Sequence, residues 1–421
     1  MERYSSYKPT SMQWLKEIPS HWEVCLLGSL AKLKTGGTPS FYLKEVEEDS
    51  VDWFTPSDFT DSFDLKKAGR KLNKRDFEEA GIAYFPPNSI LIIGIGGTAG
   101  KVSYNSIPCY SNQQITAIIP YRDVNSVFCT MYIRSLRDFL LKTAPYTTLP
   151  ILNNTFLSSI KVVLPPLAEQ EKIVSYLEDK TSKIDAYVAD KEKEIELLQE
   201  LKQKTIADAV TKGLNPDAKM KDSGIAWIGE IPEHWEVKKI GSLFVERREK
   251  VSDKEYPALS VSKQGITPQL DTAVKTDNGD NRKKVCKNDF VVNSRSDRKG
   301  SCGVSPYTGS VSLINIVLSP RKNIEVQYFH NLFRSNNYIE EYYRIGRGIV
   351  ADLWTTRYSE MRNIFVPLPP KDEQQAIVSY IEEKCQKIDK LASELQSEID
   401  CLKEYKQRLI ADCVTGQVKV S

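Results

Sequence analysis

One long segment occurs twice in this chain of 421 residues, and the repetition constrains the fold more than any other feature. Each copy begins with the pattern Leu-Pro-Pro-x-x-Glu-Gln-x-x-Ile-Val-Ser-Tyr, first at residues 164–176 and again at 368–380. The second proline suits a first helical turn, where its missing N–H costs nothing, and the acidic residues that follow suit the helix dipole. In the first copy, no proline or glycine interrupts the chain before Gly213. The sequence therefore predicts two matching helices of about 45 residues, each about 65 Å long.

Apolar residues recur along both helices with heptad spacing, which is the pattern of a coiled-coil seam. The match between the copies has no insertion and includes Lys202 and Lys406, which interrupt the seam at equivalent positions. A long helix with so narrow an apolar stripe needs a partner, and the repeat supplies one in the same chain. We therefore expect an antiparallel intramolecular coiled coil with pseudo-two-fold symmetry. The residues expected to pair the helices are Leu177, Ile184, Val188, Ile195, Leu198, Ile381, Ile388, Leu395, Ile399 and Leu402.

A second phrase, Trp-x-x-Glu-Ile-Pro-x-His-Trp-Glu-Val, occurs at residues 14–24 and 227–237, so the duplication extends beyond the helices. His21 and His234 could suggest catalysis, but no carboxylate or cysteine constellation accompanies them. We interpret the phrase as a structural latch with a packed tryptophan. The expected organisation is an arm (1–21), a globular domain (22–163), a helix (164–213), a linker with the repeated arm (214–234), a second globular domain (235–366) and a second helix (367–421).

The two globular parts contain short apolar runs of β type, separated by turns. The clearest strands are expected at residues 89–94 and 289–293, and further strands at 114–119 and 312–318. Shorter helical patterns follow these strands. We therefore expect an α+β fold: two globular domains separated by two long antiparallel helices that form an intramolecular coiled coil.

The composition describes an ordinary globular protein, with 40% hydrophobic and 27% charged residues and a net charge of +2. Any nucleic-acid surface must therefore be local. The eight cysteines show no C-x-x-C spacing, so the sequence predicts reduced thiols without a zinc site. No signal peptide or run of 18 apolar residues is present, and we expect a cytoplasmic protein without a membrane span.

No motif for bond chemistry stands out. Residues 92–100 mimic a dinucleotide or methyl-donor fingerprint, but the following segment is β-like and contains Pro108 where a helix should begin. A phosphate loop, an adenine-methylation motif and a nuclease carboxylate pair are all missing from the sequence. We expect a chain that is not an enzyme and that holds neither cofactor nor metal.

Polar and basic residues gather around the predicted turns of both globular parts. Arginine, asparagine and glutamine can bond to guanine and adenine edges, whereas lysine, serine and threonine commonly contact phosphates. Each cluster taken alone could be a solvated loop, but the arrangement occurs in both domains. The candidate DNA-binding residues are Gly96, Gly97, Thr98, Lys101, Asn112, Gln113, Gln114, Thr147, Thr148, Arg295, Arg298, Lys299, Arg344, Arg347, Thr355, Thr356 and Arg357.

Two globular domains on one rigid pair of helices suggest two readers of a single DNA duplex. Equivalent faces of a duplex recur about every 34–36 Å, so a fixed strut could place the readers on successive turns. Because the two domains differ in sequence, the combined site should be bipartite and asymmetric. A stand-alone DNA-binding regulator and a coiled-coil scaffold for protein interactions remain open as alternatives.

The doubled helix signature, the doubled arm phrase and the two variable domains resemble the specificity subunits of type I restriction–modification systems. The resemblance covers essentially the whole chain, and the helix signature maps onto Pro165, Pro166, Glu169 and Gln170 and onto Pro369, Pro370, Glu373 and Gln374. It implies a non-catalytic subunit with two target-recognition domains, each reading half of a split DNA site. It further implies two partner modification subunits that methylate adenine with S-adenosylmethionine, and restriction/translocase subunits that use ATP and Mg²⁺.

Overall fold

The computed structural model describes residues 2–40, 49–60, 62–121, 123–145, 150–270, 279–321, 324–348 and 354–420. The chain divides into two compact units. The first unit consists of Met1–Asp190 and Ser397–Ser421, and the second unit consists of Lys191–Gln396. The first unit is therefore built from segments at both ends of the sequence, whereas the second is continuous.

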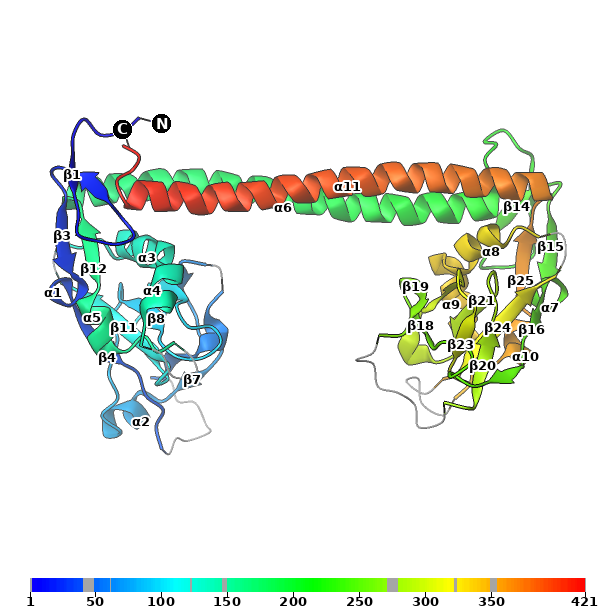
Figure 1. Cartoon of the computed structure of the whole chain (residues 1–421), viewed down its shortest axis with the longest axis horizontal. Coiled ribbons are helices and arrows are strands. Elements are labelled where there is room, and N and C mark those ends of the chain that lie inside the picture. The colour runs from blue at the N-terminus through cyan, green and yellow to red at the C-terminus, as the bar shows by residue number, and fades with distance from the viewer. Residues whose placement is uncertain are drawn as a thin grey trace. The chain divides into compact units, whose positions relative to one another are not determined.

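Two long helices, α6 (Leu167–Lys212) and α11 (Lys371–Val414), contain 46 and 44 residues (Figure 1). Both begin directly after the doubled proline. A buried glutamine ties the start of each helix to its own unit. Gln170 donates to the carbonyl of Pro165 at 2.8 Å and accepts from the backbone N–H of Asn125 at 2.8 Å. Gln374 repeats both bonds, to the carbonyl of Pro369 and from the N–H of Glu325.

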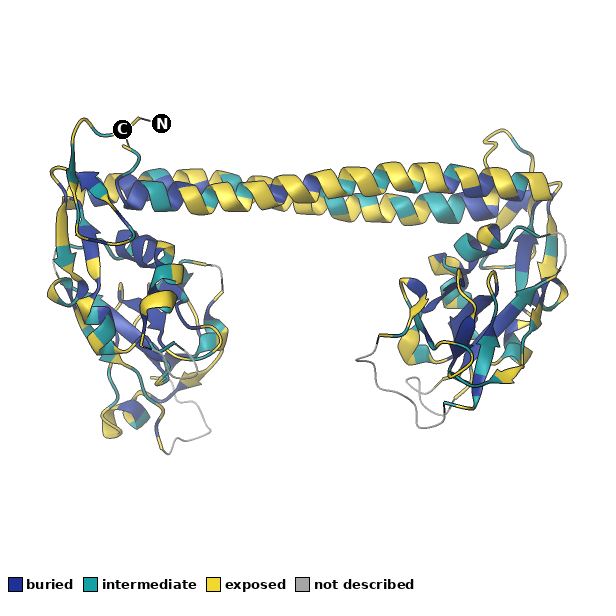
Figure 2. Cartoon of the chain, in the orientation of Figure 1, coloured by how far each residue is buried: buried dark blue, intermediate teal, exposed yellow. Residues whose placement is uncertain are grey.

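The helices pair in opposite directions within each unit. In the first unit Lys406 contacts Asp185 at 2.6 Å, and in the second Lys202 contacts Asp389 at 2.7 Å. The two lysines that interrupt the heptad thus form equivalent ion pairs across the seam. Figure 2 shows buried and half-buried residues along the seam and exposed residues on the outer faces. The expected antiparallel intramolecular coiled coil is confirmed.

All ten residues expected to pair the helices are buried or half-buried. The buried members are Leu177, Val188, Ile381, Leu395 and Ile399, and the half-buried members are Ile184, Ile195, Leu198, Ile388 and Leu402.

The first unit is an α+β domain whose main sheet has the strand order β4-β11-β8-β9-β6. Smaller sheets are β10-β5-β7, β12-β3 and β1-β2. Its elements besides the long helices are β1 (Tyr7–Pro9), β2 (Glu17–Pro19), β3 (Glu23–Leu26), α1 (Leu27–Leu30), β4 (Ala31–Thr35), β5 (Val51–Phe54), η1 (Pro56–Asp58), β6 (Asp64–Leu65), β7 (Lys71–Leu72), α2 (Lys74–Glu79), β8 (Ile90–Ile93), β9 (Val102–Asn105), β10 (Cys109–Ser111), β11 (Ile115–Pro120), α3 (Ser126–Ser135), α4 (Arg137–Thr143), α5 (Asn154–Ser159) and β12 (Lys161–Leu164).

The second unit repeats this plan with the main sheet β16-β24-β21-β22. Smaller sheets are β17-β20-β23, β15-β25, β18-β19 and β13-β14. Its elements are β13 (Met220–Asp222), β14 (Glu230–Pro232), β15 (Glu236–Lys239), α7 (Ile240–Leu243), β16 (Phe244–Glu246), β17 (Lys250–Val251), β18 (Leu259–Ser262), β19 (Gly265–Pro268), β20 (Arg282–Val285), β21 (Phe290–Asn293), η2 (Ser296–Arg298), β22 (Cys302–Val304), β23 (Gly309–Val311), β24 (Asn315–Pro320), α8 (Val326–Phe333), α9 (Asn336–Arg344), α10 (Tyr358–Met361) and β25 (Phe365–Leu368).

The main sheets of the two units have the same register. Ile90 of β8 lies opposite Ile118 of β11, and Phe290 of β21 lies opposite Leu318 of β24. In both units a helix after the sheet, α3 or α8, packs between the sheet and the long helices in one apolar core. The expected α+β duplication is therefore confirmed at the level of strand register.

The doubled arm phrase fastens the long helices to each unit. His21 contacts Glu169 of α6 at 2.8 Å, and His234 contacts Glu373 of α11 at 2.6 Å. The tryptophan after each histidine is buried against the glycine that ends the other long helix. Gly213 and Gly416 have φ values of +76° and +72°, and a Cβ on either would lie 3.1 or 3.0 Å from the indole. The left-handed backbone and the close approach of the indole ring both require glycine at these two positions.

Segments from the two ends of the chain meet in the first unit. The backbone N–H of Lys419 donates to the carbonyl of Glu2 at 2.9 Å, and the hydroxyl of Tyr7 donates to the carbonyl of Gly416 at 2.9 Å. The side-chain amide of Gln417 donates to the carbonyl of Glu17 at 3.0 Å. Residues after α11 thus complete the arm of the first unit.

The half-buried His330 is expected to make the second unit sensitive to acid. Nδ1 of His330 accepts a hydrogen bond from the N–H of Val304 at 3.1 Å, which requires the neutral ring. Burial and the Arg334 guanidinium lower the pKa of His330 from 6.5 to about 4. Since the unfolded chain binds this proton near pH 6.5, the histidine's stabilising contribution should be complete above that pH. It should decline toward pH 4 by up to about 1.4 kcal/mol per pH unit.

The decline can be measured as the free energy of unfolding of the second unit in urea at pH 7.5, 6 and 5. Hydrogen exchange of the α8 amides serves as the probe of unfolding. His330→Gln supplies an acceptor that does not titrate in this range, so the variant should lose the histidine part of the pH slope. Identical slopes for both proteins would contradict the assignment.

Candidate nucleic-acid interface

Two exposed turns lie side by side at one end of the main sheet in the first unit. One is residues 94–98, between β8 and β9, and the other is residues 112–114, between β10 and β11. We call this pair of turns the first platform. They are adjacent because β8 and β11 are paired: the N–H of Gly94 donates to the carbonyl of Gln114 at 2.7 Å. The side-chain amide of Gln114 also reaches the carbonyl of Ile95 at 3.4 Å.

The second unit has the same two turns at residues 294–298 and 312–314, which we call the second platform. Ser294 Oγ donates to the carbonyl of Ile314 at 2.5 Å and joins the turns. The backbone closes both first turns in the same way, since Gly100 and Gly300 have φ values of +79° and +78°. The platforms therefore share their place on the sheet and the closing of the first turn, but they differ in side chains and in the backbone at Gly96 and Ser296.

The structure brings most of the candidate residues of the first unit together on the first platform. Gly96, Gly97, Thr98, Asn112, Gln113 and Gln114 all belong to it. The side chain of Gln113 accepts from Thr38 at 2.8 Å, and Asn112 donates to Gln114 at 3.1 Å. Lys101 lies at the base of the turn, half-buried, with Nζ 3.3 Å from the carbonyl of Phe59. Thr147 and Thr148 lie outside the described residues.

The candidate residues of the second unit separate into two groups. Arg295 and Arg298 lie on the second platform, where Asp297 contacts their guanidinium groups at 3.1 and 3.8 Å. Lys299 and Arg344 are paired instead with acidic side chains of α9, at 2.6 Å from Glu340 and 2.7 Å from Glu341.

Backbone bridges place a further segment beside the second platform. Thr355 bridges to Arg295 and Arg347, and the N–H of Thr356 donates to the carbonyl of Ser294 at 3.0 Å. Thr356 itself is 1% exposed, and its hydroxyl donates to the carbonyl of Tyr342 at 2.9 Å. Its side chain is therefore occupied in the core, and we remove Thr356 from the candidate DNA contacts.

A cleft of about 630 Å³ runs along the second platform and carries several positive charges. Arg295, Thr355 and Arg357 line it, together with Arg248 and Lys283. Glu246 contacts both of the latter, at 2.7 and 3.3 Å. Four cationic side chains against two paired carboxylates, Glu246 and Asp297, leave an excess of positive charge that suits a polyanion.

Sequence reasoning missed Arg248, Lys283, Leu313 and Ile314, all of which line this cleft. Leu313 and Ile314 could have been found from the main sheets, whose equivalent residues differ by 200 in number. This offset makes Leu313 and Ile314 the equivalents of Gln113 and Gln114.

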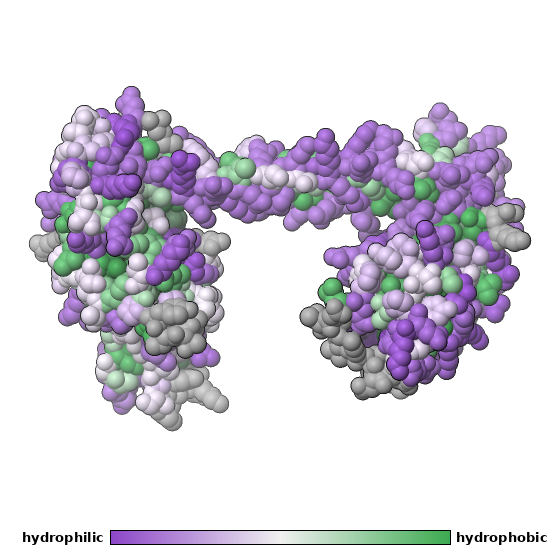
Figure 3. All heavy atoms as spheres, in the orientation of Figure 1, coloured by the Kyte–Doolittle hydropathy of each residue, from purple (hydrophilic) through white to green (hydrophobic). Residues whose placement is uncertain are grey.

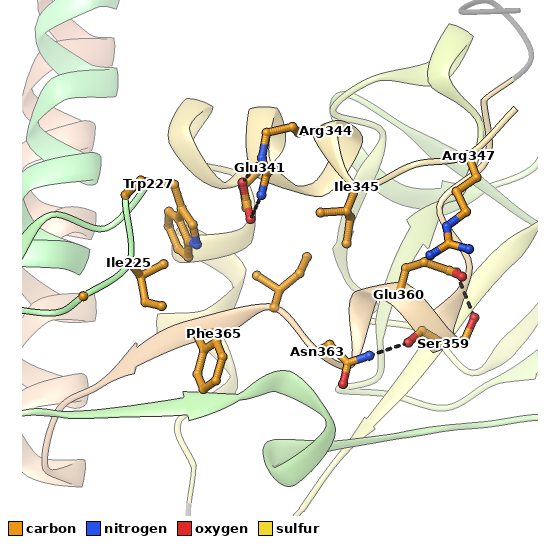
Figure 4. Close-up of a pocket in the computed structure, with 13 residues that line it drawn as sticks. Ile225, Trp227, Glu341, Arg344, Ile345, Arg347, Ser359, Glu360, Asn363 and Phe365 are labelled. Carbon is orange, nitrogen blue, oxygen red and sulfur yellow. Dashed lines mark hydrogen bonds and ion pairs between the residues drawn. The ribbon is translucent and has the colours of Figure 1, made fainter.

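Arg344 and Arg347 line a second hollow, of about 810 Å³, and do not line that cleft. The hollow lies between Trp227, α9 and α10, and Figure 4 shows Glu341 paired with Arg344 at its edge. Its lining combines two guanidinium groups with the carboxylates of Glu341 and Glu360. The charges balance, so this hollow suits a polyanion less well than the cleft does.

Three buried thiols and the possible metal-ligating side chains among the described residues bear on catalysis and metal binding. Burial raises the pKa of the Cys109, Cys129 and Cys302 thiols to about 12, which leaves them unreactive at neutral pH. Within the described ranges no group of three or more His, Cys, Asp or Glu residues could hold a metal ion. Among the helices of the same ranges, none combines the length and the apolar character needed to cross a membrane.

The duplicated α+β units, the antiparallel long helices and the two chemically different platforms define a class of internally repeated protein. The family model of the type I restriction modification DNA specificity domain matches residues 19–197 and 232–400. The chain belongs to this family of type I specificity subunits, and its role is that of a DNA sequence-specificity subunit rather than a catalytic one.

Known specificity subunits match most of the chain. The type I restriction enzyme MjaVIII specificity subunit of Methanocaldococcus jannaschii is 22% identical over 440 residues, covering 100% of this chain and 98% of the relative. The EcoBI specificity subunit of Escherichia coli is 23% identical over 357 residues, covering 78% and 73%.

Solved structures share the fold. The HsdS subunit from Thermoanaerobacter tengcongensis has a TM-score of 0.54 at 15% identity and covers 95% of this chain and 98% of its own. A chain from a structure on complex assembly and conformational transition of the type I R-M system has a TM-score of 0.69 at 15% identity, with 95% and 99% covered.

Proposed function

We propose that this chain reads a bipartite, asymmetric site in duplex DNA, one half with each unit, on behalf of a multisubunit complex. In that complex the chain positions two modification subunits that methylate adenine, and restriction/translocase subunits add ATP-dependent cleavage. S-adenosylmethionine, ATP and Mg²⁺ belong to those partners. The reading domains are residues 22–163 and 235–366. The observation that carries the proposal is the presence of two platforms at equivalent positions of the two main sheets, with different side chains.

The different side chains explain why the site should be asymmetric. The first platform offers the amides of Gln113 and Gln114, which suit adenine edges, whereas the second offers Arg295, which suits guanine. Lysine and arginine around the cleft supply contacts to phosphates, which position the protein without reading sequence. Since a methyltransferase must rotate its adenine out of the stack, a subunit that grips the duplex on both sides directs that step to one place.

The test is to assemble the chain with its modification subunits and to map methylated adenines on random-sequence DNA. We expect a split motif with two unlike halves separated by unread base pairs. A continuous motif, or two identical halves, would contradict the proposal. Measurements at several salt concentrations separate the sequence-specific part of binding from the phosphate part.

Support for two modification subunits comes from an apolar patch that recurs on the paired helices. In the second unit Leu197, Leu201 and Leu391 are 55%, 50% and 41% exposed. Their heptad positions put all three on one flank of the seam. The repeat places Tyr187 and Tyr405, 44% and 48% exposed, at equivalent positions in the first unit. Figure 3 shows small hydrophobic areas on the otherwise hydrophilic surface of the long helices.

Placing charge in this patch should release one modification subunit. We expect Leu197→Glu with Leu201→Glu to reduce the number of bound modification subunits from two to one, because exposed apolar patches on otherwise polar surfaces mark protein contacts. Native mass spectrometry of the assembled complex counts the subunits. Lys193→Glu, an exposed change on the same helix but away from the flank, should leave two bound. Full occupancy in the double variant would exclude this patch.

A further inference from the structure

The two platforms have opposite distributions of polar and apolar side chains. In the first platform the β8–β9 turn presents Ile95, and the neighbouring turn presents Gln113 and Gln114. At the equivalent positions the second platform presents Arg295, and its neighbouring turn presents Leu313 and Ile314. Each platform thus consists of one apolar turn and one polar turn, and the order is reversed between the units.

The apolar residues of these turns are exposed to solvent. Ile95 is 43% exposed, and Leu313 and Ile314 are 40% and 44% exposed. Arg295, Arg357 and Lys283 line the same cleft as Leu313 and Ile314. This arrangement does not suit the apolar surface of another protein, because desolvating the cations would oppose burial of the leucine and isoleucine. A polyanion that also carries a small apolar group fits both features.

Duplex DNA carries such a group in its major groove. The C5-methyl of thymine is the apolar feature of the base-pair edges there, and side chains read it by direct contact. Arginine pairs with guanine O6 and N7, and glutamine pairs with adenine N6 and N7. An apolar turn beside a polar turn can therefore read two neighbouring base pairs at once.

We propose that the apolar turn of each platform reads a thymine methyl group while the polar turn reads an adjacent purine. Leu313 and Ile314 contact the methyl group in the half-site of the second unit, where Arg295 contacts guanine. Ile95 contacts a methyl group in the half-site of the first unit, where Gln113 and Gln114 contact adenine. This inference rests on the proposed function, since it requires that each unit read duplex DNA.

The test replaces thymine by deoxyuridine, which removes the methyl group and keeps every hydrogen-bonding edge. The complete complex with modification subunits is bound to duplexes in which single thymines of the mapped site are replaced in turn. One replacement in the half-site of the second unit should lower affinity about fourfold, the effect of leaving one methyl group unburied. For Leu313→Ala with Ile314→Ala, the thymine and deoxyuridine duplexes should bind with nearly equal affinity.

Val245→Ala provides the matched control. Val245 is also an exposed apolar residue of the second unit, at 44%, but lies on β16 outside the platform. It should retain the fourfold difference. Because Leu313 and Ile314 lie in an exposed turn, their truncation should leave the circular dichroism spectrum unchanged. The double variant should also still discriminate base changes in the half-site of the first unit, which shows that the chain is folded.

Three results would overturn the inference. One is specific binding without any difference between thymine and deoxyuridine, which leaves the proposed function intact. Another is raised fluorescence of a neighbouring 2-aminopurine in the unmutated complex that the double variant loses, because this signal indicates a side chain wedged between bases. A complex without any sequence-specific binding would overturn both the inference and the proposed function.

Discussion

A chain that carries the first globular domain twice, with residues 23–162 in place of 236–366, is expected to recognise an inverted repeat. The pseudo-two-fold repeat pairs the long helices in opposite directions, so two identical readers on them should read identical half-sites in opposite orientation. The half-site retained should be the one assigned to the first unit. The other half of the natural site should disappear from the motif.

The junctions of this exchange fall at equivalent positions of two strand ladders. Cys25 of β3 lies opposite Val162 of β12, and Lys238 of β15 lies opposite Val366 of β25. In the exchanged domain the two strands therefore pair in the same register as the strands they replace, so their side chains lie on the same faces. Mapping methylated adenines with the modification subunits present gives the motif directly.

The reciprocal chain, with the second domain twice, is the control and should recognise an inverted repeat of the other half. If either chain kept the natural asymmetric motif, reading would not reside in the exchanged residues. A direct repeat would contradict the symmetry of the duplication.

A carboxylate in the seam should unfold one unit and leave the other folded. Leu177 is fully buried in the apolar core of the first unit, together with Leu409 and Cys413 of α11. Leu177→Asp leaves a cavity and buries a charge without a partner, and we expect it to cost about 4 kcal/mol or more. Since domains are stable by only about 5–15 kcal/mol, the first unit should open at least partly.

Hydrogen exchange by mass spectrometry would measure the two units separately in the same sample. Ile381→Asp, the equivalent change in the second unit, should produce the opposite pattern, because Ile381 is 3% exposed in the core of that unit. Ser182→Asp is the control for charge alone, since Ser182 is exposed on α6. Equal protection of both units in the Leu177 variant would contradict the division of the chain into two separately stabilised units.

The long helices could be predicted almost completely from sequence because their information is local. The doubled proline, the heptad and the terminal glycine each act within a few residues, and together they define both helices and their seam. The partners of Lys202 and Lys406 could not be predicted in this way. Their ion pairs with Asp389 and Asp185 depend on which heptads face each other, and only the assembled antiparallel pair defines that register.

The platforms were predicted only in part because their geometry is not local. Glycines predicted a turn at residues 94–100 in the first unit and at 299–303 in the second, and residues 293–299 were identified only as a polar and basic cluster. It did not show that the turn before β11 or β24 lies beside each of them, since strands distant in sequence create that adjacency. Thr356 illustrates the same limit: it lies among polar residues in sequence, but its backbone pairing with Ser294 places its side chain in the core.

The meeting of residues 2–17 with residues 416–419 has a consequence for biosynthesis. The second unit is continuous, so it can fold as soon as residue 396 has left the ribosome. The first unit waits for residues 397–420, although most of it is translated first. A nascent chain interrupted in α11 after residue 396 would therefore present a finished second reader beside an unfinished first one, and we expect such a product to hold duplex at one half-site alone.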